Sequence, residues 1–217
     1  CIFPSICKNL DTSHQNLNEI YKKVRDFENI NLVTIGSGIR YDLIIDDEND
    51  KSKEKYLNDL LKYHVSGRLK VAPEHTSDKV LKLMRKPSFE LFIKFKKLFD
   101  LKSKSLGKNL QLIPYFISSH PDCKIEDMAD LAIETKKLNY RLEQVQDFTP
   151  TPMTLATVIY FTGINPYTLE KVYVPRSKDE KLLQQIFFFW YKKENRQQII
   201  NELKKRNLSD LIKKLFG

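Results

Sequence analysis

The chain has 217 residues, 41% of them hydrophobic, so it is long enough to bury the core of one or two globular domains. Its 37 Lys and Arg against 28 Asp and Glu give a formal net charge of +9, which favours anionic partners, although scattered lysines are typical of solvated helix faces. Three cysteines are too few for a disulfide scaffold, and no apolar run reaches the roughly 18 residues of a membrane span, so we expect a cytoplasmic protein without membrane partners.

The first residues point to a start inside a longer protein. The chain begins with Cys1 rather than Met and shows no signal-peptide pattern. Cys1 and Cys7 lie six positions apart, wider than the Cys-x2-Cys spacing of most zinc sites. Free thiols are therefore the favoured interpretation of Cys1, Cys7 and Cys123, and the alternative is a further metal site completed by a thiol from upstream.

Helical and strand-like patterns alternate along the first 150 residues. In chain order they predict a helix around 17–24, a strand at 31–35, a turn at 36–40, a charged loop at 46–55, a helix at 55–63, a strand at 69–72, a helix between Thr76 and Pro87, a helix at 89–99, a strand at 110–117, a helix at 124–138 and a strand at 141–147.

Residues 67–87, GRLKVAPEHTSDKVLKLMRKP, organise this order. We expect Pro73 to end the strand because proline has no N–H, and Thr76 to be the N-cap of the helix that follows. Glu74 and His75 then lie at a strand end, where ligands bind in parallel α/β folds. The simpler alternative is a connecting loop with a helix cap.

The last third of the chain is predicted to be mostly helical. A short helix at 153–161 and a turn at 163–166 precede an additional strand or extended arm at 169–174, and helices follow from Lys178 to the end. The aromatic block at 186–191 favours a core between helices over a platform for stacked bases.

Alternating strands and helices predict an α/β fold with a parallel sheet and right-handed crossovers. Four strands in 150 residues are only part of an eight-unit barrel, which needs about 250 residues, so we expect a partial TIM-like barrel. The strand ends of a parallel sheet share one rim. That rim would bring together Ser37, Arg40, Glu74, His75, Ser119, His120 and Thr149.

Five stretches also carry a resemblance to a known family. They are IGSGIRYDL, VSGRLKVAPEHTSDKVLKLMRKP, LIPYFISSHPDC, QVQDFTPTPMTLATVIYFTGINPYTLEKVYVPRS and FFFWYKKENR. Over nearly its whole length the chain resembles the later half of the YgiQ-type radical S-adenosylmethionine proteins. The resemblance implies a partial (β/α)6 barrel, with strands four to six and following in residues 1–150 and a mostly helical C-terminal extension in residues 151–217.

The resemblance also implies an activity for the full-length protein. A [4Fe-4S] cluster held by a Cys-x3-Cys-x2-Cys motif would cleave S-adenosylmethionine reductively to a 5′-deoxyadenosyl radical, with an unknown substrate and a reductant protein such as flavodoxin or ferredoxin. This sequence lacks that motif, which in the family precedes the region where the chain begins. We therefore expect a C-terminal fragment that binds no cofactor and is inactive alone, with no metal ligand of its own.

Candidate cofactor residues follow from the same resemblance. It matches the fourth, fifth and sixth strand ends, in turn, with Ser37 and Arg40, with Lys70, Glu74 and His75, and with Ser118, Ser119 and His120. The Glu74 carboxylate can accept hydrogen bonds from ribose hydroxyls, and Arg40 or Lys70 can pair with the cofactor's carboxylate. A purely structural Arg40 to Glu74 ion pair is the alternative for these residues.

A second function from a different class stays open. The basic chain would then be a binding module for RNA or another acidic partner, with affinity that falls as salt rises. No RNA- or DNA-binding motif supports this alternative, which depends on charge alone.

Overall fold

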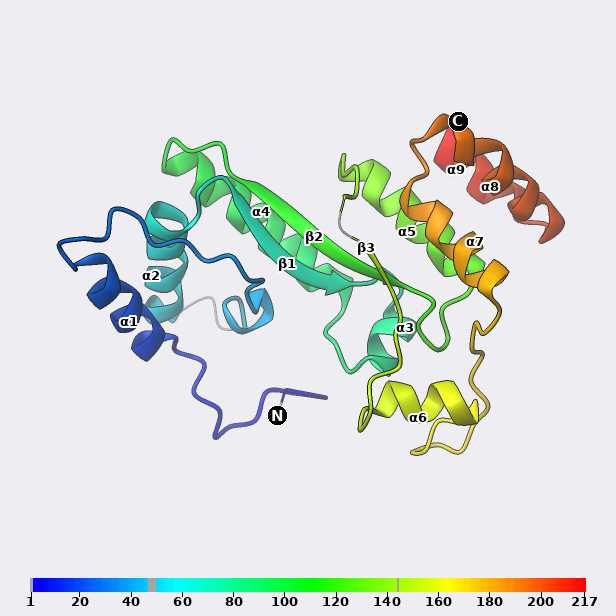
Figure 1. The fold of residues 1–217 in the computed structure, drawn as a ribbon, viewed down its shortest axis with the longest axis horizontal. Helices are drawn as coiled ribbons and strands as arrows, with labels where there is room; N and C mark the ends of the chain where they lie inside the picture. Colours follow the sequence, from blue (N-terminus) through cyan, green and yellow to red (C-terminus); the bar gives the residue numbers. More distant parts are fainter. Residues whose placement is uncertain (1, 47–49, 144) are drawn as a thin grey trace. The chain divides into compact units, whose positions relative to one another are not determined.

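A computed structural model describes residues 2–46, 50–143 and 145–217 and shows a mixed α/β protein. The described strands form a three-stranded sheet in the order β1-β2-β3. They are β1 (Arg68–Glu74), β2 (Gln111–Ser118) and β3 (Val145–Asp147). Strands β2 and β3 are parallel, with Phe116 opposite Val145, and Figure 1 shows β1 and β2 pointing the same way. The predicted α/β class is confirmed, and the barrel stays a prediction.

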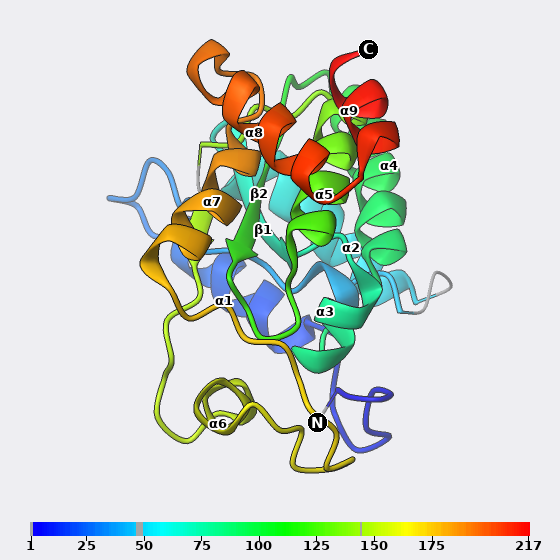
Figure 2. The same cartoon turned by 90° about the vertical axis from the view of Figure 1, so that its right-hand side faces the viewer.

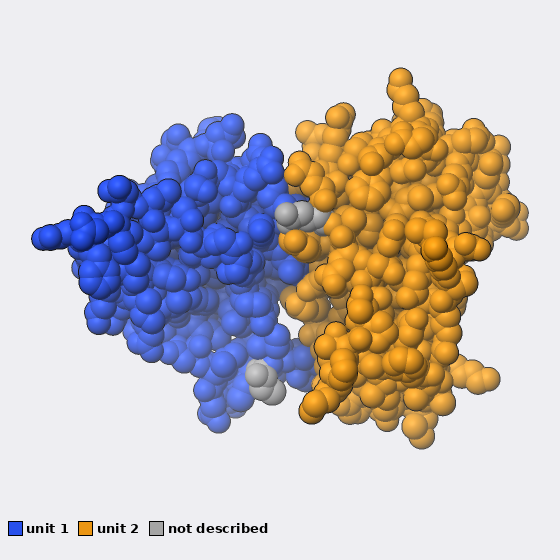
Figure 3. All heavy atoms as spheres, viewed as in Figure 1, with its two compact units in different colours: residues 1–72, 90–114 blue, residues 73–89, 115–217 orange. Residues whose placement is uncertain are grey.

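The chain divides into two compact units (Figure 3). The first unit comprises Cys1–Ala72 and Glu90–Pro114, and the second comprises Pro73–Phe89 and Tyr115–Gly217. This division follows spatial compactness, so the functional boundary expected at residue 150 stays a prediction.

The first unit is built from helices around the opening residues of β1 and β2. These helices are α1 (Gln15–Arg25), the 3-10 turn η1 (Tyr41–Leu43), α2 (Lys51–Asp59), the π-helical turn η2 (Leu60–His64) and most of α4 (Phe89–Ser105). The core contains fully buried Phe92, Phe95 and Phe99 from α4, and the Tyr41 ring lies 5.4 Å from that of Phe95. Burial of these aromatic rings stabilises the first unit.

The strand expected at 31–35 is absent from the structure. Leu32 is 67% exposed, and single bonds from the Ile35 N–H to the His64 oxygen (3.0 Å) and from the Ile39 N–H to the Lys70 oxygen (3.2 Å) are the described backbone links. Ile39 instead forms an isolated parallel bridge with Val71. The β-branched residues favour a strand locally, but a strand also needs a ladder of partners, which the described chain does not provide.

The charged loop expected at 46–55 is shorter than predicted. Helix α2 begins at Lys51, because the Asp50 side chain accepts the Ser52 N–H (2.8 Å) as an N-cap. Residues 47–49 of that prediction lie outside the described residues.

The expected effect of Pro73 on β1 is wrong. The strand continues through Pro73 to Glu74, since β1 is the outer strand of the described sheet, where a residue without an N–H is tolerated. Helix α3 (Asp78–Leu83) then begins one residue later than predicted, with Ser77 at the N-cap in place of Thr76.

In the second unit, helices gather around α5 (Ile125–Lys137), as Figure 2 shows. Helices α7 (Lys178–Phe188) and α9 (Ser209–Phe216) contact α5, while α8 (Lys193–Lys205) contacts both α7 and α9. Phe187 and Phe188 are fully buried, which confirms the core role predicted for part of the aromatic block.

Two connecting regions are less regular than predicted. Strand β3 is limited to three residues of the expected 141–147, and Gln144 lies outside the described residues. After α6 (Leu155–Thr162), the 169–174 segment is an extended arm joined by one antiparallel bridge between Ile164 and Lys171. In the described ranges no helix combines the length and apolarity that crossing a membrane requires.

Candidate functional site

A pocket of about 350 Å³ in the second unit lies at the carboxyl ends of all three strands. We call it the rim pocket. Strand ends contribute Glu74, Ile117 and Asp147, and the segments that follow them contribute His120, Phe148 and Thr149. Its volume is within the range of small-molecule sites, and its walls mix apolar surface with a few polar groups, as such sites do.

Glu74 forms the β1 side of the rim pocket. Its backbone has a left-handed φ of 67°, and its Oε1 lies 3.1 Å from Lys86 Nζ. Helix α3 is only six residues long. Arg85 and Lys86 come shortly after it and line the same pocket as Glu74. Sequence reasoning missed both residues, and the nearby stop at Pro87 is the signal that could have placed them.

Strands β2 and β3 place a second carboxylate in the rim pocket. The Ser118 hydroxyl donates to Asp147 Oδ1 (3.0 Å), and the Phe148 N–H donates to the Ser118 carbonyl oxygen (2.8 Å). Ser118 is itself buried, so this predicted residue orients Asp147. Asp147 ends a predicted strand, and that position is the signal for it.

His120 lines the rim pocket as a neutral imidazole. Burial lowers its pKa to about 4, against a smaller opposite effect of the hydrogen bond to Pro121. Its Nδ1–H donates to the Pro121 oxygen (2.8 Å), which leaves Nε2 as an acceptor, and its ring meets the Phe148 ring edge-to-face at 5.0 Å. His120 can therefore accept a ligand hydrogen bond without carrying charge.

His75 lies behind the rim pocket and is fully buried. Its Nδ1 accepts the Ser77 N–H (3.0 Å), so Nε2 carries the proton and faces Cys123 Sγ at 3.4 Å. Burial lowers the pKa of His75 to about 4 and raises the pKa of the Cys123 thiol. Both groups are uncharged at neutral pH, so the pair lacks the thiolate of a cysteine nucleophile and has a structural role.

Asp127 connects the loop after β1 to the start of α5. It accepts hydrogen bonds from the Ser77 hydroxyl (2.8 Å) and the Lys124 N–H (2.9 Å), and its Oδ2 lies 2.8 Å from Lys79 Nζ. A carboxylate in the first turn of a helix is also favoured by the helix dipole. Ser77 and Asp127 are 50 positions apart in the chain, so the contact between them comes from the tertiary structure.

Ser119 is held by a residue far along the chain. Its N–H donates to Gln184 Oε1 (2.7 Å), and Gln184 Nε2 donates to the Cys123 oxygen (2.8 Å). Sequence reasoning missed Gln184. Its signal was a polar residue on the buried helix face of Phe187 and Phe188, three and four positions away.

The other three predicted residues belong to the first unit. Ser37 is exposed, Lys70 is half-buried, and Arg40 Nε donates to Asp42 Oδ1 (2.8 Å), which raises the pKa of Arg40 further. Since Arg40 pairs with Asp42 and Glu74 with Lys86, each charge has a local partner. The Arg40 to Glu74 pair considered from sequence is not needed to explain either residue.

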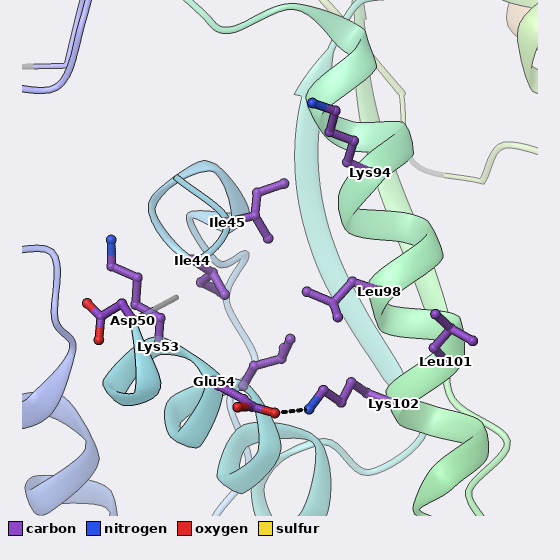
Figure 4. Close-up of a pocket in the computed structure, with 10 residues that line it drawn as sticks. Ile44, Ile45, Asp50, Lys53, Glu54, Lys94, Leu98, Leu101 and Lys102 are labelled. Atoms are coloured by element: carbon purple, nitrogen blue, oxygen red, sulfur yellow. Dashed lines mark hydrogen bonds and ion pairs between the residues drawn. The ribbon is translucent and has the colours of Figure 1, made fainter. Parts of the chain in front are cut away.

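A second pocket of about 380 Å³ lies in the first unit between α2, α4 and the residues after η1 (Figure 4). We call it the α2–α4 pocket. Leu57, Leu98 and Leu101 contribute apolar surface, and Lys102 Nζ lies 2.5 Å from Glu54 Oε1. The buried Lys53 likewise pairs with Asp46, so helix charges here largely neutralise one another.

The described cysteines do not fit an iron-sulfur cluster. No group of three His, Cys, Asp or Glu side chains within residues 2–46, 50–143 and 145–217 could hold a metal ion. Cys123 is buried with a raised pKa, Cys7 is half-buried in the first unit, and Cys1 lies outside the described residues.

Comparisons with known proteins show a family and several proteins to which this chain is similar. Residues 143–214 match a family described as "Domain of unknown function (DUF3362)". The whole chain is 55% identical over 221 residues to a "UPF0313 protein" of Bacteroides thetaiotaomicron and 52% identical over 220 residues to one of Porphyromonas gingivalis. Another, of Clostridium perfringens, is 43% identical over 212 residues and matches 98% of this chain.

The chain spans about a third of the length of these relatives, covering 36%, 35% and 31% of the three proteins. Their names state no activity. The matched residues 143–214 include β3, α6 and α7, so the region similar to this family contains part of the rim pocket and also Gln184.

Proposed function

We propose that this chain forms the cofactor-binding rim and the C-terminal part of a cytoplasmic radical S-adenosylmethionine enzyme. In this proposal β1, β2 and β3 are later strands of a partial TIM-like barrel. The observation that supports it is the rim pocket, in which two carboxylates and a neutral histidine meet at the carboxyl ends of the strands.

The chemistry of the rim pocket suits S-adenosylmethionine. Glu74 and Asp147 can accept hydrogen bonds from ribose hydroxyls, and His120 Nε2 can accept one from an amino group. Phe148 gives an aromatic surface for adenine, and Lys86 a cation for the carboxylate of the methionine part. An iron-sulfur cluster held by the longer protein would supply the electron for cleavage of the cofactor, whereas these residues would bind and orient the cofactor.

The activity is tested with a full-length protein that contains this chain. After anaerobic reconstitution with iron and sulfide, we expect release of 5′-deoxyadenosine when the protein is reduced in the presence of S-adenosylmethionine. An intact cluster without any release would contradict the proposal. Binding of RNA whose affinity falls steeply with salt, with no cofactor cleavage, would favour the basic binding module instead.

The site is tested by Glu74→Gln in the same protein. We expect the Kd for S-adenosylmethionine to rise about tenfold, because a charged acceptor facing the ligand becomes a neutral amide. Glu170→Gln, at an exposed position after α6, is the matched control and should leave the Kd unchanged. Equal affinities of the Glu74→Gln variant and the unmodified protein would remove Glu74 from the site.

A further inference from the structure

We infer that Gln184 of α7 is a positioning residue for the rim pocket, so that the helical region of unknown function holds the wall of the site. The loop from Ser119 to Lys124 joins β2 to α5 and carries His120, which lines the rim pocket. This role of Gln184 rests on the proposed function only for the identity of the ligand.

The loop has a backbone that needs outside support. Ser119 and Asp122 have left-handed φ angles of 60° and 66°, which cost free energy for residues other than glycine. Gln184 is fully buried and uses both ends of its amide on this loop, at Ser119 (2.7 Å) and Cys123 (2.8 Å). The Asp122 N–H donates to the Tyr173 oxygen (2.7 Å). This is a second hydrogen bond between the loop and the segment that leads into α7.

These ties fix two walls of the rim pocket. His120 lies between Ser119 and Asp122, so its place depends directly on the loop. Cys123, whose oxygen Gln184 binds, contacts His75 through its sulfur at 3.4 Å. His75 is the neighbour of Glu74, so the same contacts extend to the β1 side of the site.

The chemistry explains why an amide stands at this position. Gln184 accepts from one backbone group and donates to another, and an apolar side chain would leave the buried Ser119 N–H and Cys123 oxygen unpaired. Gln184→Leu removes both bonds at similar volume. Gln184→Glu is the conservative variant, because burial favours a protonated carboxyl group that accepts from the Ser119 N–H and donates to the Cys123 oxygen.

The first experiment is hydrogen exchange of the full-length protein, measured by mass spectrometry on a peptide covering residues 118–124. We expect exchange in this peptide to be about tenfold faster in Gln184→Leu and close to normal in Gln184→Glu. Phe187→Leu is the matched control, because it removes buried packing from the same helix and keeps the Gln184 amide that bonds to the loop. Equal exchange in Gln184→Leu and Phe187→Leu would overturn the inference.

The second experiment measures the Kd of the same proteins for S-adenosylhomocysteine. We expect a rise of about tenfold for Gln184→Leu, partial recovery for Gln184→Glu and no change for Phe187→Leu, even though both leucine variants melt at lower temperature. If the unmodified protein does not bind this probe, the proposed function fails while the exchange experiment still decides the role of Gln184. If it binds and Gln184→Leu binds equally well, the positioning role is wrong.

Discussion

The rim pocket and the α2–α4 pocket are similar in volume, about 350 and 380 Å³, but differ in how they are built. The α2–α4 pocket has walls of helix side chains, and its Lys102 and Glu54 charges pair with each other (Figure 4). The rim pocket lies where strands end, and Glu74 in its wall is followed directly by the buried His75, which contacts Cys123. Volume alone therefore does not distinguish the two pockets, whereas the buried polar residues next to their walls do.

Backbone strain separates the two pockets in the same way. Among described non-glycine residues with positive φ, Glu74 and Arg85 line the rim pocket, and none lines the α2–α4 pocket. Such conformations cost roughly 1 kcal/mol or more each and persist only where the surroundings hold them. We therefore interpret the α2–α4 pocket as a packing feature and the rim pocket as a site maintained at a cost in stability.

The largest expected effect is a loss of stability at the α2–α4 pocket, which we interpret as a packing feature. Leu57→Ala removes a side chain that is 1% exposed and should lower the free energy of unfolding by about 3 kcal/mol, measured by urea denaturation. Hydrogen exchange at the rim loop, residues 118–124, should stay unchanged under native conditions. A loss below about 1 kcal/mol would show that α2 adds little to the core of the first unit.

The next largest effect is expected at Asp127, which connects the loop after β1 to the start of α5. Asp127→Ala leaves the Ser77 hydroxyl and the Lys124 N–H without their acceptor and leaves Lys79 with its longer contact to Asp122 (4.0 Å), so it should cost about 2 kcal/mol of unfolding free energy. Asp130→Ala, on the exposed side of the same helix, is the control and should cost much less. Similar losses in both variants would mean that the contacts of Asp127 add little to the unfolding free energy.

The buried histidines predict a pH dependence. Burial lowers the pKa of His75 to about 4 in the folded protein, against roughly 6.5 when unfolded, so the unfolded chain binds more protons between these values. Stability should therefore fall as pH falls from 6.5 towards 4. His75→Gln should reduce that slope by up to about 1.4 kcal/mol per pH unit, while the slope above pH 7.5 should be the same in both proteins. An unchanged slope at low pH would contradict burial of a neutral His75.

The smallest effect is expected at the ion pair beside the α2–α4 pocket. Lys102→Ala should leave the midpoint of urea denaturation almost unchanged, because the Glu54 partner is mostly exposed to solvent. A double-mutant cycle with Glu54→Ala measures the pair directly. A coupling clearly larger than the experimental error would show that this exposed pair does stabilise the first unit.

The sequence predicted those helices and strands whose hydrophobic periodicity matches their burial in the structure. Helix α5 and strand β2 lie within one residue of the expected 124–138 and 110–117, because apolar periodicity alone identifies a helix or strand that is buried along its length. The strand expected at 31–35 failed because propensity does not supply ladder partners. Glu74 and His120 were correctly expected at strand ends and line the rim pocket, and His75 was placed there too but lies behind it.

The sequence by itself determined the α/β class, the ends of β2 and β3 to within one residue and the helical C-terminal region, since each follows from local periodicity and from residues that stop strands or helices. Only the tertiary structure decided that Gln184 binds a loop 65 positions earlier in the chain and that His75 faces Cys123 across 48 positions. Such contacts depend on where separate elements pack, and neither periodicity nor capping patterns carry that information.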